Sequence, residues 1–154
     1  MTDTREGGCA CGQVRYRLTS APLFVNCCHC LSCQRQTGNA FVINLLIEVD
    51  RVQLLAGSPV PIDVPRDDGS FQTIFRCSAC QIAVWSIYSR PQVKFVRAGT
   101  LDDPASVAPG AHIFVRSKLP WVSLPASVPA FEVYYDMKTL WPPASLARLA
   151  ALGS

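Results

Sequence analysis

The sequence contains no long hydrophobic run. Although 49% of its 154 residues are apolar, they fall in short stretches, and none approaches the roughly 18 consecutive apolar residues of a membrane-spanning helix. The first residues, MTDTREGG, also lack the apolar segment of a secretory signal. These absences argue against a membrane span and predict a cytoplasmic protein with no membrane partner.

Glutamate is scarce as well. Only Glu6, Glu48 and Glu132 are present, and none lies beside a cysteine motif in the sequence. Zinc-dependent nucleobase deaminases need a glutamate close to their metal ligands as a proton shuttle. Deamination is therefore a poor fit to this chain.

Cysteine, by contrast, is abundant, with eight residues in the chain. Four disulfides are not expected in a cytoplasmic protein, because glutathione and thioredoxin keep thiols reduced there. Metal binding or catalysis is the better interpretation. Four of these cysteines and one of the two histidines crowd into the stretch NCCHCLSCQRQTGNAFVI, residues 26–43.

The pattern of apolar residues predicts an all-β fold. Val14, Tyr16 and Leu18 alternate with polar neighbours, as in a half-buried strand. Proline-rich stretches at 57–69 and 119–129 predict ordered loops. Strands are expected at 13–19, 40–47, 51–56, 71–77, 82–88, 93–98, 112–117 and 131–135, and one short helix, docked or frayed, at 143–152. No boundary divides the chain, so a single domain over residues 1–154 is expected.

Two cysteine pairs far apart in the sequence have the spacing of a zinc site. Cys9 and Cys11 form a CxC pair, and Cys77 and Cys80 form a CxxC pair. Such short spacers let one segment supply two thiolates to a tetrahedral zinc ion. The four together predict a closed, structural zinc site, with free or redox-active thiols as the alternative.

This pairing leaves Cys28, Cys30 and Cys33 as three ligands within six residues. A zinc ion with three protein ligands keeps its fourth position for water or substrate, as catalytic sites do. Cys27 points to the opposite face if the segment is extended, so it is expected to be a packed apolar thiol. The alternative is a fourth ligand that a thiol substrate displaces.

The charge of these sites favours thiol chemistry and disfavours nucleic acid binding. Three thiolates around a divalent zinc ion are net negative, which weakens activation of water but leaves a fourth, bound thiolate nucleophilic. Relative to neutral thiols, seven thiolates remove seven positive charges and two zinc ions add four, so the net charge of +3 falls to zero. The basic residues are also scattered, so no nucleic acid partner is expected.

Five motifs occur together and in order: GGCACGQVRY, CCHCLSCQRQTGNAF, FRCSAC, AGTLDD and HIFVRSKLPW. In these the chain resembles the glutathione-dependent formaldehyde-activating enzyme family, which includes centromere protein V. The resemblance covers a core of about residues 7–135, with a C-terminal tail at 136–154. It implies a β-tent-like fold of short antiparallel strands and two zinc ions per chain, divided as above. It also implies a carbon–sulfur lyase that adds glutathione, as co-substrate, to formaldehyde, giving S-hydroxymethylglutathione.

One position departs from the family pattern, because Gln81 follows the last CxxC where glycine is common. Glutamine adopts a left-handed turn only at a steric cost, so a slightly different turn is expected. Other residues near the motifs have two interpretations each. His29 and His112 are candidates either for proton transfer or for structural hydrogen bonds. Arg35, Arg116 and Lys118 could bind the carboxylates of glutathione or could be ordinary surface charges. Trp85 and Trp121 could anchor the core and a loop or could contact a ligand.

Three classes of function follow. The first is a zinc-dependent enzyme that acts on small-molecule thiol and electrophile substrates, either glutathione with formaldehyde or another thiol adduct at the same site. The second is a non-catalytic, zinc-stabilised binding module. The third, a nucleic-acid-binding zinc ribbon, ranks last because no basic face with aromatic residues is visible.

Overall fold

In the computed structural model, which describes residues 3–153, ten strands form two sheets. The strands are β1 (Arg5–Gly8), β2 (Arg15–Leu18), β3 (Phe24–Cys28), β4 (Val42–Glu48), β5 (Val52–Ala56), β6 (Val60–Pro65), β7 (Phe71–Arg76), β8 (Ala83–Ile87), β9 (Val93–Arg97) and β10 (Ala111–Ile113). The α-helices are α1 (Leu31–Thr37), α2 (Met137–Leu140) and α3 (Pro143–Ala151). The fold is mainly β, as predicted. Among these residues, no helix is long and apolar enough to cross a bilayer.

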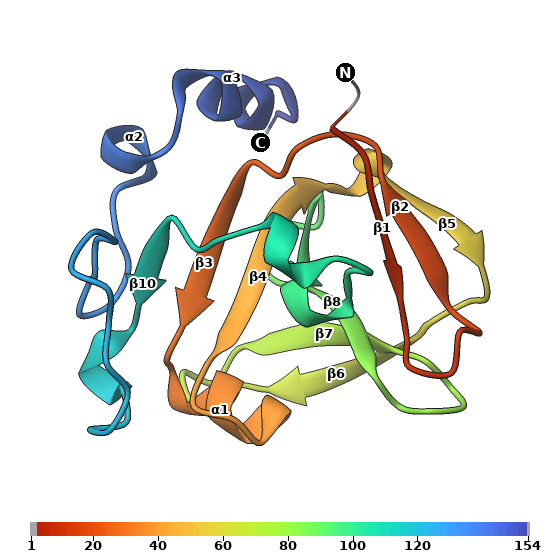
Figure 1. Cartoon of the computed structure of the whole chain (residues 1–154), viewed down its shortest axis with the longest axis horizontal. Coiled ribbons are helices and arrows are strands. Elements are labelled where there is room, and N and C mark those ends of the chain that lie inside the picture. Colours follow the sequence, from red (N-terminus) through yellow and green to blue (C-terminus); the bar gives the residue numbers. More distant parts are fainter. Residues whose placement is uncertain (1–2, 154) are drawn as a thin grey trace.

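The strands divide unequally between the sheets. The smaller sheet has the order β1-β2-β5, and the larger has the order β10-β3-β4-β9-β8-β7-β6. Figure 1 shows the small sheet on the right and the C-terminal helices at the upper left, beyond β10 and β3. Neighbouring strands run antiparallel except β10 and β3, which pair in parallel. The expectation of antiparallel strands alone is therefore wrong at this edge.

Strand β4 is buried on both faces, so its side chains pack into two separate hydrophobic cores. Leu45 and Ile47 pack with Tyr16 on the side of the small sheet. Leu46 points the other way and packs in the cluster that contains Trp141, because successive side chains alternate across a strand. The C-terminal segment thus covers a face of the large sheet that would otherwise be exposed.

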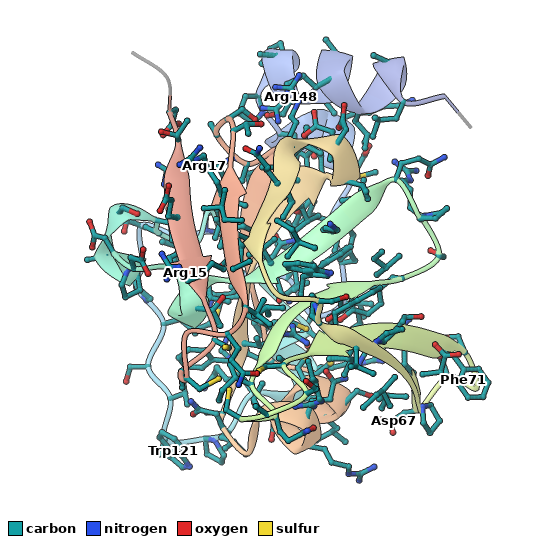
Figure 2. All side chains as sticks on the ribbon, turned by 90° about the vertical axis from the view of Figure 1, so that its right-hand side faces the viewer. Arg15, Arg17, Asp67, Phe71, Trp121 and Arg148 are labelled. Atoms are coloured by element: carbon teal, nitrogen blue, oxygen red, sulfur yellow. The ribbon has the colours of Figure 1, made fainter. Side chains whose placement is uncertain are left out.

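The C-terminal helix is docked rather than frayed. The Trp141 ring stacks on Phe24 with 5.6 Å between ring centroids. Arg148, labelled at the top of Figure 2, donates to both carboxylate oxygens of Glu48 across 2.8 and 2.6 Å. Glu48 is almost fully buried, so this ion pair ties α3 to the end of β4.

Most predicted strands are observed, but two are wrong in part or whole. The strand expected at 112–117 ends at Ile113, because Phe114 has a left-handed φ of 55° and a 3-10 turn, Val115–Ser117, follows. The strand expected at 131–135 is an irregular segment beside β10. Within the described part of the chain, its one ladder contact is an isolated bridge from the preceding residue, Ala130, to His112.

The loop expected at 57–69 contains strand β6. Pro61 and Pro65 are tolerated there because β6 is the edge strand of its sheet and pairs only with β7. Strand β3 was not predicted either, since Asn26, Cys27 and Cys28 are all buried and show no polar alternation.

Candidate metal centres and active-site cavity

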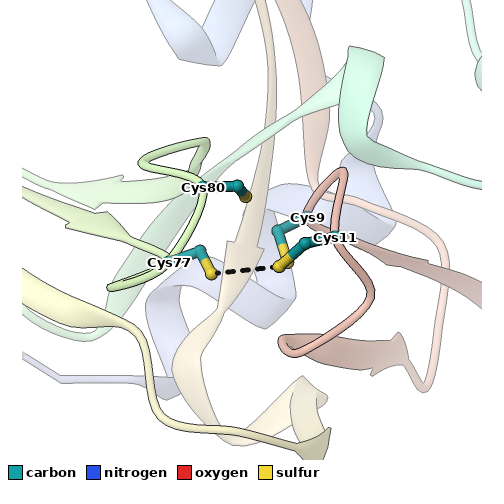
Figure 3. Close-up of side chains that lie close together, drawn as sticks. All are labelled: Cys9, Cys11, Cys77 and Cys80. Atoms are coloured by element: carbon teal, nitrogen blue, oxygen red, sulfur yellow. Dashed lines mark hydrogen bonds between the residues drawn. The ribbon is translucent and has the colours of Figure 1, made fainter.

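The four cysteines of the two separated pairs meet in space. Cys9 and Cys11 lie on the turn after β1, and Cys77 and Cys80 on the turn after β7. Their sulfurs lie within 4.8 Å of one another, and Figure 3 shows the two turns presenting them to each other. The Sγ atoms of Cys9 and Cys11 are 3.5 Å apart, and those of Cys11 and Cys77 are 3.7 Å apart.

These distances suit a tetrahedral zinc ion. Zinc–sulfur bonds of about 2.3 Å at tetrahedral angles place two sulfurs about 3.8 Å apart. All four cysteines are free rather than disulfide-bonded. The donor set therefore fits a closed zinc site that joins the small sheet to the end of β7.

The turn after Cys77 contains a strained residue. Gln81 adopts a left-handed φ of 63°, and its N–H donates to the carbonyl oxygen of Cys77 across 3.0 Å. Its side-chain amide also donates to the carbonyl of Ser78. The turn is thus the left-handed one that glycine would favour, and the expectation of a different turn is wrong.

Cys28, Cys30 and Cys33 converge at the junction of β3 and α1. Cys28 ends β3, and Cys30 caps the helix by accepting the N–H of Cys33 at 3.3 Å. This cap places Cys33 on the first turn of α1, so the three sulfurs lie within 4.8 Å of one another. They form a three-donor group that can hold a metal ion with one position left for another ligand.

A buried cation, Arg97, lies beside this group. Arg97 is 6% exposed and donates to neutral oxygens of Asn44, Ser86 and Gln36. No carboxylate within residues 3–153 forms an ion pair with it, although a buried charge needs compensation. A hydrogen bond with Cys28 and the positive charge of Arg97 act to lower the pKa of the Cys33 thiol, but the hydrogen bond with Cys30 and burial outweigh them and raise it to about 12. Three thiolates around zinc carry a net charge of −1 and would compensate the charge of Arg97.

Each group contains at least one thiol that is predisposed to ionise. Burial opposes ionisation of Cys9, but hydrogen bonds from the Val14 N–H and the neighbouring thiols lower its pKa to about 6. Hydrogen bonds from Cys28 and Cys33 lower the pKa of Cys30 to about 2. Since the thiolate is the form that binds metals, both groups favour a cation.

Cys27 belongs to neither group. It lies with His29 and His112, on the face of β3 opposite to Cys28, and burial raises the pKa of its thiol to about 12. The His29 Nε2 and His112 Nδ1 atoms are 3.0 Å apart in a buried hydrogen bond. Burial lowers the pKa of His29 to about 4. Both histidines are thus placed for structural hydrogen bonding and do not line the cavity described next.

The three-cysteine group forms one wall of a cavity of about 190 Å³. Besides the thiols, aromatic rings and neutral amides surround it, and among residues 3–153 Arg66 is the one charged residue that lines it. The lining residues that matter below are Asn26, Gln72, Tyr88, Phe95, Phe114 and Tyr134. None of the residues in the four-cysteine group lines this space.

A second, more open groove adjoins the cavity. Cys30, Ser32, Arg66 and Phe114 line both spaces. The outer groove also contains Arg116 and two exposed acidic residues, Asp67 and Asp68. Charges of both signs therefore surround its entrance.

The other sequence candidates lie elsewhere. The Lys118 Nζ donates to two backbone carbonyls, and Arg35 is largely solvent-exposed, 3.9 Å from Asp67. Trp85 is buried in the core, whereas Trp121 is 72% exposed. Figure 2 shows Trp121 and Asp67 at the end of the molecule opposite Arg148.

Comparisons with known proteins agree with the motifs. The family model described as glutathione-dependent formaldehyde-activating enzyme matches residues 4–117. A provisionally named glutathione-dependent formaldehyde-activating enzyme of Halomonas elongata is 30% identical over 125 residues, which are 77% of this chain and 80% of that protein. A crystal structure of a Rhodobacter sphaeroides protein is similar with a TM-score of 0.48 and 17% identity, over 82% of this chain and 99% of the other.

Proposed function

Because the chain belongs to the glutathione-dependent formaldehyde-activating enzyme family, we propose that it is a zinc-dependent carbon–sulfur lyase. Its reaction is the reversible addition of glutathione to formaldehyde, giving S-hydroxymethylglutathione. The observation that carries the proposal is the convergence of Cys28, Cys30 and Cys33 on the wall of a cavity. A purely structural zinc site would not need such a space.

The two cysteine groups have different roles in this proposal. Cys9, Cys11, Cys77 and Cys80 hold a structural zinc ion, and Cys28, Cys30 and Cys33 hold a catalytic one. When bound at the second group, zinc supplies a Lewis acid that lowers the pKa of an incoming thiol. The protein cysteines act as ligands and not as nucleophiles.

The outer groove suits glutathione, a zwitterionic peptide with two carboxylates and one ammonium group. Arg66 and Arg116 offer guanidinium groups to the carboxylates. Asp67 and Asp68 offer partners for the ammonium group. The groove reaches Cys30, so a peptide bound there directs its thiol toward the three cysteines while the cavity behind them holds the second reactant.

The test is exchange NMR of formaldehyde with glutathione, comparing the wild-type protein and Cys30→Ser at matched concentration, with zinc counted in both. Because the uncatalysed reaction also occurs, the variant sets the baseline. We expect faster exchange with the wild-type protein alone. Equal exchange, with two zinc ions bound to the wild-type protein, would overturn this substrate assignment and favour a non-catalytic binding module or another thiol adduct.

A further inference from the structure

The cavity behind the three cysteines is more apolar than a one-carbon substrate requires. Tyr88 and Phe95 pack edge to face with 4.5 Å between ring centroids. Phe114 joins them with a left-handed backbone, held by its N–H donating to the Val133 carbonyl at 2.7 Å. A bulky residue with positive φ is strained, and such strain persists where the surroundings enforce it. These rings give an apolar substituent a surface to contact, which formaldehyde lacks.

Two amide side chains in the same cavity have unused hydrogen-bonding atoms. Gln72 is 1% exposed, and neither its Nε2 nor its Oε1 finds a partner among the described residues. The Nδ2 of Asn26, which is equally buried, finds none either. Buried polar atoms are nearly always paired in proteins. The cavity thus offers two unpaired amide donors and one unpaired amide acceptor to a polar group of a ligand, while much of its remaining wall is aromatic.

The orientation of Asn26 follows from its neighbours. The Trp141 indole N–H can only donate, and it donates to the Tyr135 hydroxyl at 2.8 Å. The Tyr135 hydroxyl then donates its own proton to the Asn26 Oδ1 at 2.8 Å. The Asn26 Nδ2 donor is therefore the atom left unused. Trp141 and Tyr135 are positioning residues for it.

We propose that this cavity receives a carbonyl compound with an apolar or aromatic substituent, and that Asn26 and Gln72 bind its oxygen. The inference rests on the proposed function and specifies its electrophile. In the reaction, the thiol sulfur forms a C–S bond with the carbonyl carbon. The C=O π bond opens, its electron pair moves to the oxygen, and the proton lost by the thiol ends on that oxygen. The product is a hemithioacetal, and the reverse reaction releases thiol and aldehyde.

The unused amide atoms can bind this oxygen both as the carbonyl of the aldehyde and as the hydroxyl of the hemithioacetal. The two amide N–H donors bind a carbonyl oxygen and the negative charge that develops on it. The Gln72 Oε1 acceptor binds the hydroxyl proton of the hemithioacetal. The charged ends of glutathione suit this cavity poorly. Among the described lining residues only Arg66 is charged, and it lies at the junction with the outer groove.

The first test compares aldehydes with the zinc-loaded, full-length protein. Exchange NMR with glutathione is run on formaldehyde, 2-methylpropanal and phenylacetaldehyde, each corrected for its uncatalysed rate. We expect kcat/KM for phenylacetaldehyde to exceed that for formaldehyde by about tenfold or more, since even one methylene in an apolar pocket is worth about that factor. Acceleration of formaldehyde alone would overturn this inference and leave the proposed function standing. No acceleration of any aldehyde would overturn both.

The second test uses matched glutamine variants. Gln72→Leu keeps the size of the side chain and removes its unused polar atoms, so the fold should be as stable as that of the wild type or more so. We expect the kcat for phenylacetaldehyde to fall about 100-fold. Gln53→Leu makes the same change on exposed β5 and should leave the kcat unchanged. An active Gln72→Leu protein with wild-type kcat would contradict the role of the amide.

A third test needs neither activity nor metal. The side-chain amide signals of Asn26 and Gln72 are visible in a ¹⁵N-correlated NMR spectrum and are assigned by their loss in Asn26→Leu and Gln72→Leu. We expect 2-phenylethanol, an unreactive alcohol with a ring, to shift both signals more than methanol does at equal concentration. Equal small shifts with both alcohols would contradict an apolar subsite next to these amides.

Discussion

Arg97 and Asn44 lie opposite each other on β9 and β4, and the arginine Nη1 donates to the asparagine Oδ1 across 2.6 Å. Cross-strand pairing therefore places a buried guanidinium group next to Asn44, which lines the three-cysteine cavity. The bond holds the cation where a negatively charged metal–thiolate group would compensate it.

Replacing Arg97 should weaken metal binding at the three-cysteine group. Arg97→Met removes the compensating charge, so we expect zinc affinity there to fall by roughly 10- to 100-fold, as for other residues that support metal ligands indirectly. Competition with a chromophoric chelator measures the affinity. The control is Arg90→Met at an exposed site. Equal affinities in the two variants would mean that the group is not the counter-charge of Arg97.

Neighbouring cysteines on β3 should behave differently. Cys28→Ala removes a proposed zinc ligand and should lower the zinc content from two to about one per chain, with loss of activity. Cys27→Ala changes the residue that packs near His29 and His112 on the opposite face, so it should keep both zinc ions. Elemental analysis of the two purified variants gives the answer. Loss of a zinc ion from Cys27→Ala would instead assign Cys27 as a ligand.

The ion pair between Arg148 and Glu48 should make stability depend on pH. Burial alone raises the pKa of Glu48, but hydrogen bonding to Arg148 and the nearby arginine charges more than offset this, so the pKa is lowered. A lowered carboxylate pKa stabilises the fold above the unfolded-state pKa of roughly 4.3. That stability is lost as pH falls through the folded-state pKa.

Arg148→Met should therefore cost about 2 kcal/mol at pH 7 and flatten the decline in stability toward pH 3. Urea unfolding across this pH range measures both effects. Lys138→Met, at an exposed cation of the same C-terminal segment, is the control. If Arg148→Met unfolds like Lys138→Met at every pH, the C-terminal helix is not anchored through Glu48.

The strained turn at Gln81 offers a stabilising substitution. Gln81→Gly relieves a left-handed backbone that costs a non-glycine residue about 1 kcal/mol, so we expect a gain of up to about that size. Gly12, in the other cysteine turn, has a φ of 78° and open space around it. Gly12→Ala should therefore lose a similar amount through backbone strain alone. Thermal unfolding of the zinc-loaded variants compares them, and a destabilised Gln81→Gly would contradict the strain.

The cysteine groups could be predicted from the sequence because ligand spacing is a local property. Cys28, Cys30 and Cys33 lie within one turn and one helix start, and the CxC and CxxC pairs each occupy a single turn. The four-cysteine group could be predicted by assuming only that the CxC pair and the CxxC pair come together in the fold. The assignment of metals and of roles to these groups remains a prediction.

The rest of the cavity could not be predicted, because pairing of distant strands creates it. Gln72 and Arg97 look like ordinary polar residues of half-buried strands, and only the strand order β3-β4-β9-β8-β7 brings them near the cysteines. Arg66 lies in the proline-rich stretch 57–69, which was expected to be a loop but contains the edge strand β6. Trp141 lies beyond the recognisable motifs, and its link to Asn26 through Tyr135 depends on the docking of the C-terminal segment.

The central claim, that the three-cysteine group holds a metal ion open to a thiol, is tested most directly with cobalt. Cobalt(II) replaces zinc in thiolate sites and reports its ligands by absorption. We predict that glutathione strengthens the thiolate-to-cobalt band of the wild-type protein, with saturation at one equivalent per chain. In Cys30→Ser, which keeps the four-cysteine group, the spectrum should not respond. A wild-type spectrum that glutathione leaves unchanged, with two cobalt ions bound, would contradict the account.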